Sequence, residues 1–312
     1  MALELLFEDV TEIVAAQQMA IFIEVSGDPK PGNVTPGRPF AEMSFQDMVS
    51  AAISIEAPLL GVYRDFRADM ARGSRGLWGR GLYESCKAAC RKTNTLFGSL
   101  LLQIPIGLGA CAAVRQGEVL REAQRILRSS TVEDSLYFVR AARESKVGGL
   151  NHPQISSDEE VREYDITRPR VEDTISRSGI CLLDLLSMSA SYDLIASELV
   201  DGFPLTRRCA ALFSRLLDQT SDPLKASSLC FCTLLSEIPD SLVARKSGRQ
   251  VAEEVRRRAE RAMREEAYSQ RWLREMDLLD RFLREKDLNP GALADITGAG
   301  ILLFLLGEAP SG

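Results

Sequence analysis

The chain has 312 residues, of which 45% are hydrophobic and 26% are charged, so a disordered chain and a multi-span membrane protein are both excluded. Acidic residues outnumber basic ones by 44 to 38, and the resulting net charge of −6 argues against a nucleic acid as partner. Seven cysteines do not pair evenly and no charged secretory leader is recognisable, so we expect reduced thiols in a cytoplasmic protein.

The first predicted element is a helix over residues 3–26, because apolar residues recur there at three- and four-residue steps. The next segment, residues 27–32, contains two prolines and two glycines and cannot continue a helix. A stiff connection is therefore expected directly after Ser26.

A second helix is predicted from a capping signal. Ser44 and Asp47 have the spacing of a capping box, and the helix they open should run to about Ala57, before Pro58. Residues 73–81 are rich in glycine and arginine, which predicts a loop.

Residues 96–114 form a nearly uninterrupted apolar stretch that is long enough to cross a bilayer. Pro105 lies in its middle, three glycines lower its helix propensity, and no second such segment exists. We therefore expect no membrane span, and predict instead a helix buried on all sides.

The rest of the chain is also predicted to be helical. Amphipathic helical periodicity marks eight further segments: residues 118–128, 132–145, 170–190, 205–219, 224–238, 251–266, 271–286 and 292–306. Residues 147–168 are polar and predict an ordered loop. No segment resembles a linker, so we predict one all-α domain over residues 1–312, a multi-helix bundle around a central buried apolar helix.

The segment from Ser26 to Val34 is the most informative for function. Its two glycines, five residues apart, are similar to those of a nucleotide phosphate loop, but Asn33 and Val34 stand where lysine and serine or threonine belong. Rigid prolines, glycine N–H groups and Lys30 would still suit an anion. A stiff helix connection is an equally good interpretation.

Two other polar segments precede apolar helices. Residues 93–95 (Thr-Asn-Thr) and 289–291 (Asn-Pro-Gly) place amide and hydroxyl groups beside predicted helix N-termini, where the helix dipole favours phosphate. Ordinary helix capping is the simpler alternative for each. Arg245 and Lys246 are predicted to lie in a turn, as a phosphate contact or a surface pair.

The single histidine limits the chemistry that can be expected. His152 lies in a glycine-rich segment, where an exposed loop position is the default interpretation. One imidazole nearly excludes histidine-rich zinc sites and Ser-His-Asp catalysis elsewhere in the chain. An enzyme with this sequence should therefore use carboxylates, lysine, arginine and amides.

Five blocks follow one another along the chain: Glu24-Val25-Ser26 with residues 29–34, 45–48 and 50–52; Asn94-Thr95 before residues 100–105; residues 147–150; residues 239–246; and residues 289–295. In this order the blocks resemble the triphosphoribosyl-dephospho-CoA synthase family over about residues 20–306. The resemblance implies an all-α transferase that joins ATP to 3′-dephospho-CoA and releases adenine. It also implies ATP as substrate and Mg²⁺ as a metal ion.

Residue roles follow from the resemblance. We expect three carboxylates to act in catalysis or metal binding: Glu24, Asp47 and Asp295. We expect nine residues to bind phosphate or substrate: Lys30, Gly32, Asn33, Asn94, Thr95, Arg245, Lys246, Asn289 and Gly291. Carboxylates would stabilise the oxocarbenium-like centre that forms when a ribose C1–N9 bond breaks.

Two alternatives remain open. Residues 35–43 lack the Asn-Gly-Ala-His stretch of the decarboxylase-linked members, and the Pro-Gly-Asn-Val form resembles a branch linked to tetrahydromethanopterin coenzyme synthesis. A different, pterin-type acceptor is therefore the first alternative, and a non-catalytic helical interaction protein is the second. A homodimer through residues 292–306 is compatible with the sequence.

Overall fold

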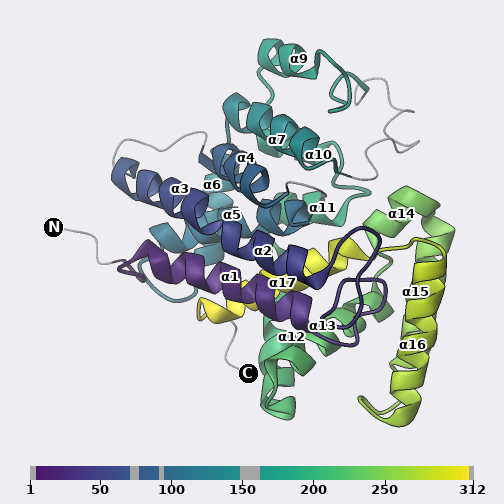
Figure 1. Ribbon diagram of the computed structural model, residues 1–312. Helices are drawn as coiled ribbons and strands as arrows, with labels where there is room; N and C mark the ends of the chain where they lie inside the picture. Colours follow the sequence, from purple (N-terminus) through teal and green to yellow (C-terminus); the bar gives the residue numbers. More distant parts are fainter. Residues whose placement is uncertain (1–4, 71–76, 91–94, 148–161, 309–312) are drawn as a thin grey trace.

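The computed structural model describes residues 5–70, 77–90, 95–147 and 162–308 (Figure 1). In these ranges the regular structure is helical, apart from two isolated bridges, Thr35 with Arg38 and Phe40 with Met43. The all-α prediction is therefore confirmed. Among the helices of the described ranges, none combines the length and the apolarity that a membrane crossing requires.

Seven helices precede the gap at residues 148–161: α1 (Val10–Ser26), α2 (Phe45–Ser54), α3 (Glu56–Asp69), α4 (Leu77–Ala89), α5 (Phe97–Ala112), α6 (Val119–Arg128) and α7 (Val132–Glu144). Nine described helices follow it: α9 (Val171–Ser178), α10 (Leu182–Ser187), α11 (Leu194–Asp201), α12 (Pro204–Thr220), α13 (Pro223–Glu237), α14 (Ser241–Ser247), α15 (Arg249–Ala262), α16 (Gln270–Glu285) and α17 (Gly291–Leu305).

The predicted central apolar helix is α5. Every residue of α5 except Gly98 is buried, and the helix packs against α1, α3, α4, α6, α11 and α17. Gly107 is needed inside it, because a side-chain Cβ there would lie 2.1 Å from the Tyr63 hydroxyl. The second buried helix, α17, packs against α1, α5, α12 and α13, so α5 and α17 together form the core of the bundle.

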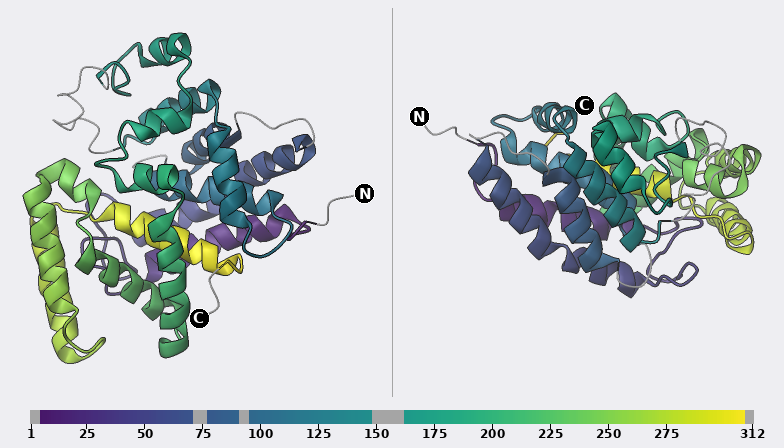
Figure 2. Two further views of the ribbon diagram at one scale, coloured as in Figure 1. Left: turned by 180° about the vertical axis from the view of Figure 1, so that it is seen from behind. Right: turned by 90° about the horizontal axis from the view of Figure 1, so that it is seen from above.

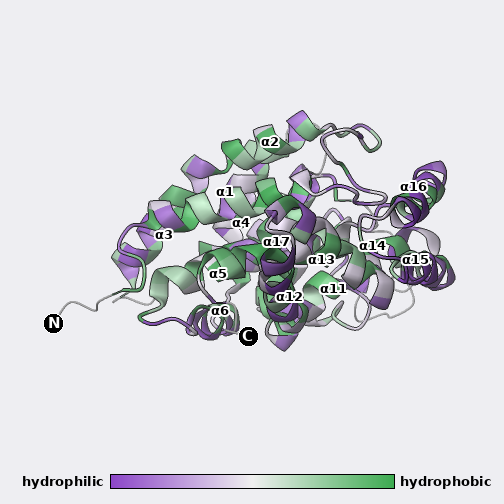
Figure 3. Ribbon diagram, turned by 90° about the horizontal axis from the view of Figure 1, so that it is seen from below, coloured by the Kyte–Doolittle hydropathy of each residue, from purple (hydrophilic) through white to green (hydrophobic). Residues whose placement is uncertain are grey.

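Helices α15 and α16 form a pair that contrasts with this core. Both views in Figure 2 place the two helices at one end of the molecule, and Figure 3 shows mainly hydrophilic residues on them. Ion pairs between residues four apart cover their exposed sides, for example Arg258 with Glu254 and Arg281 with Asp277.

Several local signals behave as the sequence predicts. Helix α1 ends at Ser26, and Ser44 and Asp47 form a complete capping box at the start of α2. The predicted end of this helix, about Ala57, is wrong by three residues: α2 ends at Ser54, Ile55 separates it from α3, and Pro58 lies in the first turn of α3 instead of after a helix end.

Four further predicted boundaries are wrong. Helix α1 begins at Val10, capped by Asp9, rather than near residue 3. Helix α4 begins at Leu77, inside the predicted loop, and its Gly79 lets the helix approach the backbone of Asp134, since a Cβ would come within 2.5 Å of it. The predicted helix over residues 170–190 is broken by the left-handed Gly179.

The fourth error concerns the functional site. Arg245 and Lys246 lie in the last turn of α14 rather than in a turn between helices. At seven residues, α14 is too short to give a clear periodic signal between Pro239 and Gly248. Helix α11, with eight residues, is also too short to show a period, and the sequence does not predict it.

Candidate active site

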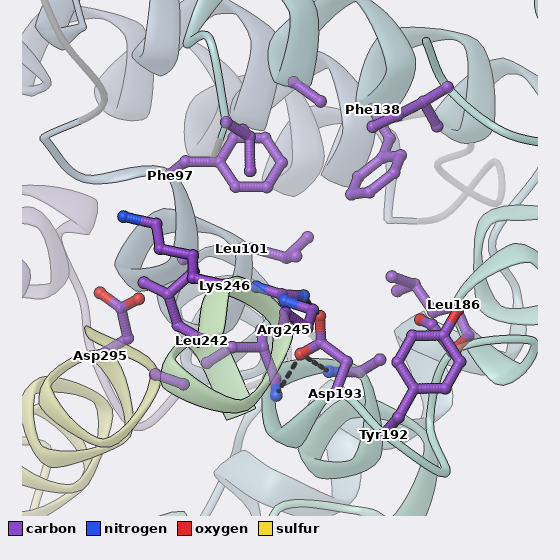
Figure 4. A pocket seen from close by; sticks show the side chains of 18 of the residues that line it. Phe97, Leu101, Phe138, Leu186, Tyr192, Asp193, Leu242, Arg245, Lys246 and Asp295 are labelled. Carbon is purple, nitrogen blue, oxygen red and sulfur yellow. Dashed lines mark hydrogen bonds and ion pairs between the residues drawn. The ribbon is translucent and has the colours of Figure 1, made fainter. Parts of the chain in front are cut away.

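A cavity of about 590 Å³ lies between α5, α7, α10, α11, α14 and α17 (Figure 4). One part of its wall is apolar. The charged and amide side chains on the wall are Glu42, Lys146, Asp165, Asp193, Arg245, Lys246, Asn289 and Asp295. Four of the predicted site residues therefore share one cavity: Arg245, Lys246, Asn289 and Asp295.

Asp295 is the acidic centre of this cavity. It lies in the second turn of α17 and faces the start of α5, where the Ser99 hydroxyl donates a hydrogen bond to its Oδ1. Burial raises the pKa of Asp295 to about 7; the Ser99 bond opposes the rise, and the charge of Glu24 adds to it. At neutral pH this carboxyl group is therefore poised to take or give a proton.

Gly98 leaves the space that Asp295 occupies. A Cβ at position 98 would lie 2.0 Å from Asp295 Oδ2, which is closer than any non-bonded contact allows. The N-cap residues of α5 and α17 make no side-chain cap bond, and residues at both N-termini line the cavity. Asp240 accepts from the Leu293 N–H of α17, so the other first-turn N–H groups are the ones that can meet an anion.

The basic side of the cavity comes from the end of α14. Arg245 forms an ion pair with Asp193, whose carboxylate also accepts from the Ile195 and Ala196 N–H groups at the start of α11. Arg245 Nε is buried and has no hydrogen-bond partner among the described residues. The neighbouring Lys246 side chain is exposed at the cavity wall.

Asp240 fixes α14 relative to α17. Its carboxylate accepts hydrogen bonds from the Leu242 and Val243 N–H groups of α14 and from the Leu293 N–H of α17, at 2.8–3.0 Å. Burial raises the pKa of Asp240 to about 6, although these three bonds oppose the rise. The basic and acidic walls of the cavity are thus joined by one side chain.

Asn289 and Gly291 form the entry to α17. Asn289 lines the cavity, and its Oδ1 is buried without a partner in the described part of the chain. Gly291 begins the helix, and a Cβ there would lie 3.0 Å from Leu242. The predicted closing block therefore meets the predicted basic block in space.

The Lys30 loop lies apart from this cavity. The Lys30 ammonium donates to the Glu24 carboxylate and to the Glu24 carbonyl oxygen at the end of α1, and both residues are at least 94% buried. Lys30 lines a separate cavity of about 210 Å³. Lys30 and Glu24, two predicted site residues, are thus partners of each other.

Gly32 and Asn33 hold the same loop in place. Gly32 has a φ of +72°, and a Cβ there would lie 2.8 Å from Pro290, so the loop rests on the segment before α17. Asn33 is buried, and its carbonyl oxygen accepts from Arg284.

Asp280 on α16 organises this region, and the sequence did not point to it. Its carboxylate accepts from the Gly32 N–H, from Arg38 and from Arg284, at 2.7–2.9 Å. Burial alone would raise the pKa of Asp280, but these three bonds hold it below the usual value.

Two predicted site residues lie elsewhere. The Asp47 carboxylate caps α2, and the Thr95 hydroxyl donates to the Ala89 carbonyl oxygen; neither residue lines a cavity described above. Asn94 and His152 lie outside the described residues. Within the described ranges, no group of three or more histidine, cysteine or acidic residues is arranged to hold a metal ion.

Comparison with known proteins gives this geometry a context. A solved structure from Archaeoglobus fulgidus, assigned as a triphosphoribosyl-dephospho-CoA synthase, is 28% identical, with a TM-score of 0.63 over 84% of this chain and 98% of that chain. No curated protein matches the chain. The CitG family model, described as ATP:dephospho-CoA triphosphoribosyl transferase, matches residues 10–311. The chain therefore belongs to this family of transferases, as the order of its sequence blocks predicted.

Proposed function

We propose that the cavity beside Asp295 is the site of triphosphoribosyl transfer from ATP to dephospho-CoA, and that Asp295 is its acid–base group. The observation that supports this most directly is a carboxyl group with a pKa of about 7 in the wall of the 590 Å³ cavity. Most carboxyl groups titrate near pH 4, and a value close to neutrality suits proton transfer.

The reaction requires one proton to leave and one to be gained. The acceptor ribose hydroxyl attacks C1 of the ATP ribose and loses its proton, while the C1–N9 bond breaks and adenine must be protonated. Asp295 accepts the first proton as a carboxylate, and as a carboxylic acid it can return a proton to the departing base. Its negative charge also stabilises the oxocarbenium-like centre.

The intact triphosphate needs donors close to this carboxyl group. The N-termini of α5 and α17 supply N–H groups other than that of Leu293, and Asn289 has an amide group beside them. A Mg²⁺ ion bound mainly through the triphosphate would need only one or two carboxylates of the protein.

The Glu24–Lys30 pair acts on Asp295 through its charges. The Glu24 carboxylate raises the pKa of Asp295 and the Lys30 ammonium lowers it. In this proposal the pair tunes the acid–base group instead of holding phosphate directly, and Asp47 serves the fold as the cap of α2.

Two further points belong to the proposal. All seven cysteines are free thiols, which supports a reducing compartment such as the cytoplasm. Residues 292–306, the homodimer face expected from the sequence, are largely buried inside the chain as α17 and are not available for such a contact. Met19 and Phe22 on α1 and Ile53 on α2 are 43–63% exposed, and we propose them for a homodimer contact instead. Light scattering of the full chain and of Ile53→Glu tests that contact.

The transfer itself is tested by incubating the full chain with ATP, Mg²⁺ and dephospho-CoA and measuring free adenine by chromatography. Asp295→Asn should lower adenine release by about 100-fold or more, because the amide cannot accept the proton. The matched control is Asp218→Asn, an exposed position on α12, which should keep wild-type turnover. Undiminished turnover of Asp295→Asn would refute the assignment.

A further inference from the structure

The cavity has a distinct apolar part, formed by Phe97 and Leu101 of α5, Phe138 of α7, Leu186 of α10 and Tyr192 just before α11. We call these five residues the apolar lobe. The rings of Phe97 and Phe138 lie 5.8 Å apart, centroid to centroid, and form one wall. The transfer chemistry proposed above does not use this lobe.

The groups that line the cavity follow a definite order. In Figure 4, Asp295 and the Lys246 ammonium lie at one side, Leu186 and Tyr192 lie at the other, and Arg245 lies between them. The cavity therefore offers a carboxyl group beside an ammonium group at one side, a guanidinium group in the middle, and the apolar surface of Leu186 and Tyr192 at the far side.

Dephospho-CoA carries complementary groups in the same order. Its adenosine ribose bears the attacking hydroxyl, the diphosphate follows on the 5′ carbon, and the uncharged pantetheine arm, with its methyl groups, follows the diphosphate. ATP ends in a triphosphate at the corresponding place, and placing that much negative charge against apolar side chains is unfavourable.

We propose that the apolar lobe binds the pantetheine arm of the acceptor, with Arg245 and Lys246 at its diphosphate and its ribose hydroxyl at Asp295. This inference rests on the proposed function, since it needs the reaction to occur at Asp295. It makes Phe138 and Tyr192 specificity-determining residues, because they distinguish dephospho-CoA from a second ATP molecule in the acceptor position.

The experiment compares dephospho-CoA with ADP, which lacks the arm and ends in a free phosphate. Binding of dephospho-CoA and of ADP to the full chain is measured by calorimetry without ATP, so no turnover is needed. Wild type should bind dephospho-CoA roughly tenfold or more tightly than ADP, because only the former buries apolar surface in the lobe. Tyr192→Ala should reduce that ratio to about twofold, by weakening dephospho-CoA alone.

The controls separate the lobe from the fold and from the reaction. Leu278→Ala removes an apolar side chain that is 50% exposed on α16 and should leave the ratio unchanged. If Tyr192→Ala does not fold by circular dichroism, Phe138→Leu, which keeps the wall filled, should lower the ratio in the same direction. Equal affinities of wild type for the two ligands, or equal weakening of both by the variants, would overturn the proposal. If the wild-type protein shows the expected affinity ratio but releases no adenine from ATP and dephospho-CoA, the result would instead overturn the proposed transfer at Asp295.

Discussion

The Lys30 loop and the α14–α17 wall both carry sequence blocks of the family, yet the structure uses their charges in opposite ways. In the loop, Lys30 is buried against Glu24, and Asp280 is saturated by three donors. In the wall, Lys246 is exposed at the cavity, and Arg245 and Asn289 each keep a buried polar atom without a partner among the described residues. Charge already paired within the protein stabilises the fold, whereas unsatisfied polar groups remain available to a ligand.

This difference changes how Lys30 is interpreted. A sequence pattern of prolines, glycines and one lysine is typical of an anion-binding loop. Here the same residues fix the end of α1 against α16 and the entry of α17. The loop acts on the cavity through its position and its charges, not by binding phosphate. The following predictions test this difference between the loop and the wall.

The largest effect is expected on stability. Lys30→Met leaves the Glu24 carboxylate buried and unpaired and should lower the free energy of unfolding by about 3–5 kcal/mol, measured by urea denaturation. Adding Glu24→Gln should restore part of the loss. The control Arg208→Met breaks an exposed pair with Glu237 and should cost less than about 1 kcal/mol. A stable Lys30→Met protein with a raised KM for ATP would show instead that Lys30 binds phosphate.

The second prediction concerns the wall. Gly98→Ala places a Cβ where Asp295 Oδ2 lies and should displace this carboxyl group, lowering adenine release by about tenfold or more while the helices are retained. Gly61→Ala is the matched control, because it lies on the exposed side of α3 with open space around it. It should leave turnover unchanged and slightly raise stability. Equal turnover of both variants would contradict the position assigned to Asp295.

The smallest effect is a pH dependence of stability. The pKa of Asp295 is about 7 in the folded chain and about 4 when unfolded, so the folded state holds more protons between these values. Stability should therefore fall as pH rises from about 4 to about 7, and Asp295→Asn should escape that fall. Its Tm advantage over wild type should grow by roughly 3 °C or more between pH 5 and pH 8. Asp240 is present in both proteins, so its titration cancels; parallel Tm curves would contradict the raised pKa.

Much of the fold follows from local patterns. Long periodic segments such as α5 and α16 are predictable because one chemical pattern persists over several turns. The capping box at Ser44 is equally local. The errors fall where tertiary contacts decide or an element is short: α4 includes Gly79, which its packing against α7 requires, and α14 is too short to show a period.

The site is only partly predictable, because its pairings are non-local. The sequence indicates Asp295 and Arg245, but gives no sign that Ser99 would bond the former or Asp193 the latter. Nor can spacing show that Lys30 turns back to Glu24, six residues earlier. Asp240 could have been predicted as an N-cap residue. It lies in a family block directly before α14, and an aspartate at that position is a strong N-cap signal.

The shared carboxylate of Asp240 has a mechanical consequence. Because one side chain bonds the N-termini of both α14 and α17, a shift of the helix that carries Lys246 is transmitted to the helix that carries Asp295. Phe138 and Leu186 of the apolar lobe lie on α7 and α10, and neither residue takes part in this link. The spacing between positive charge and acid–base group is thus set by one shared carboxylate, independently of these two lobe residues.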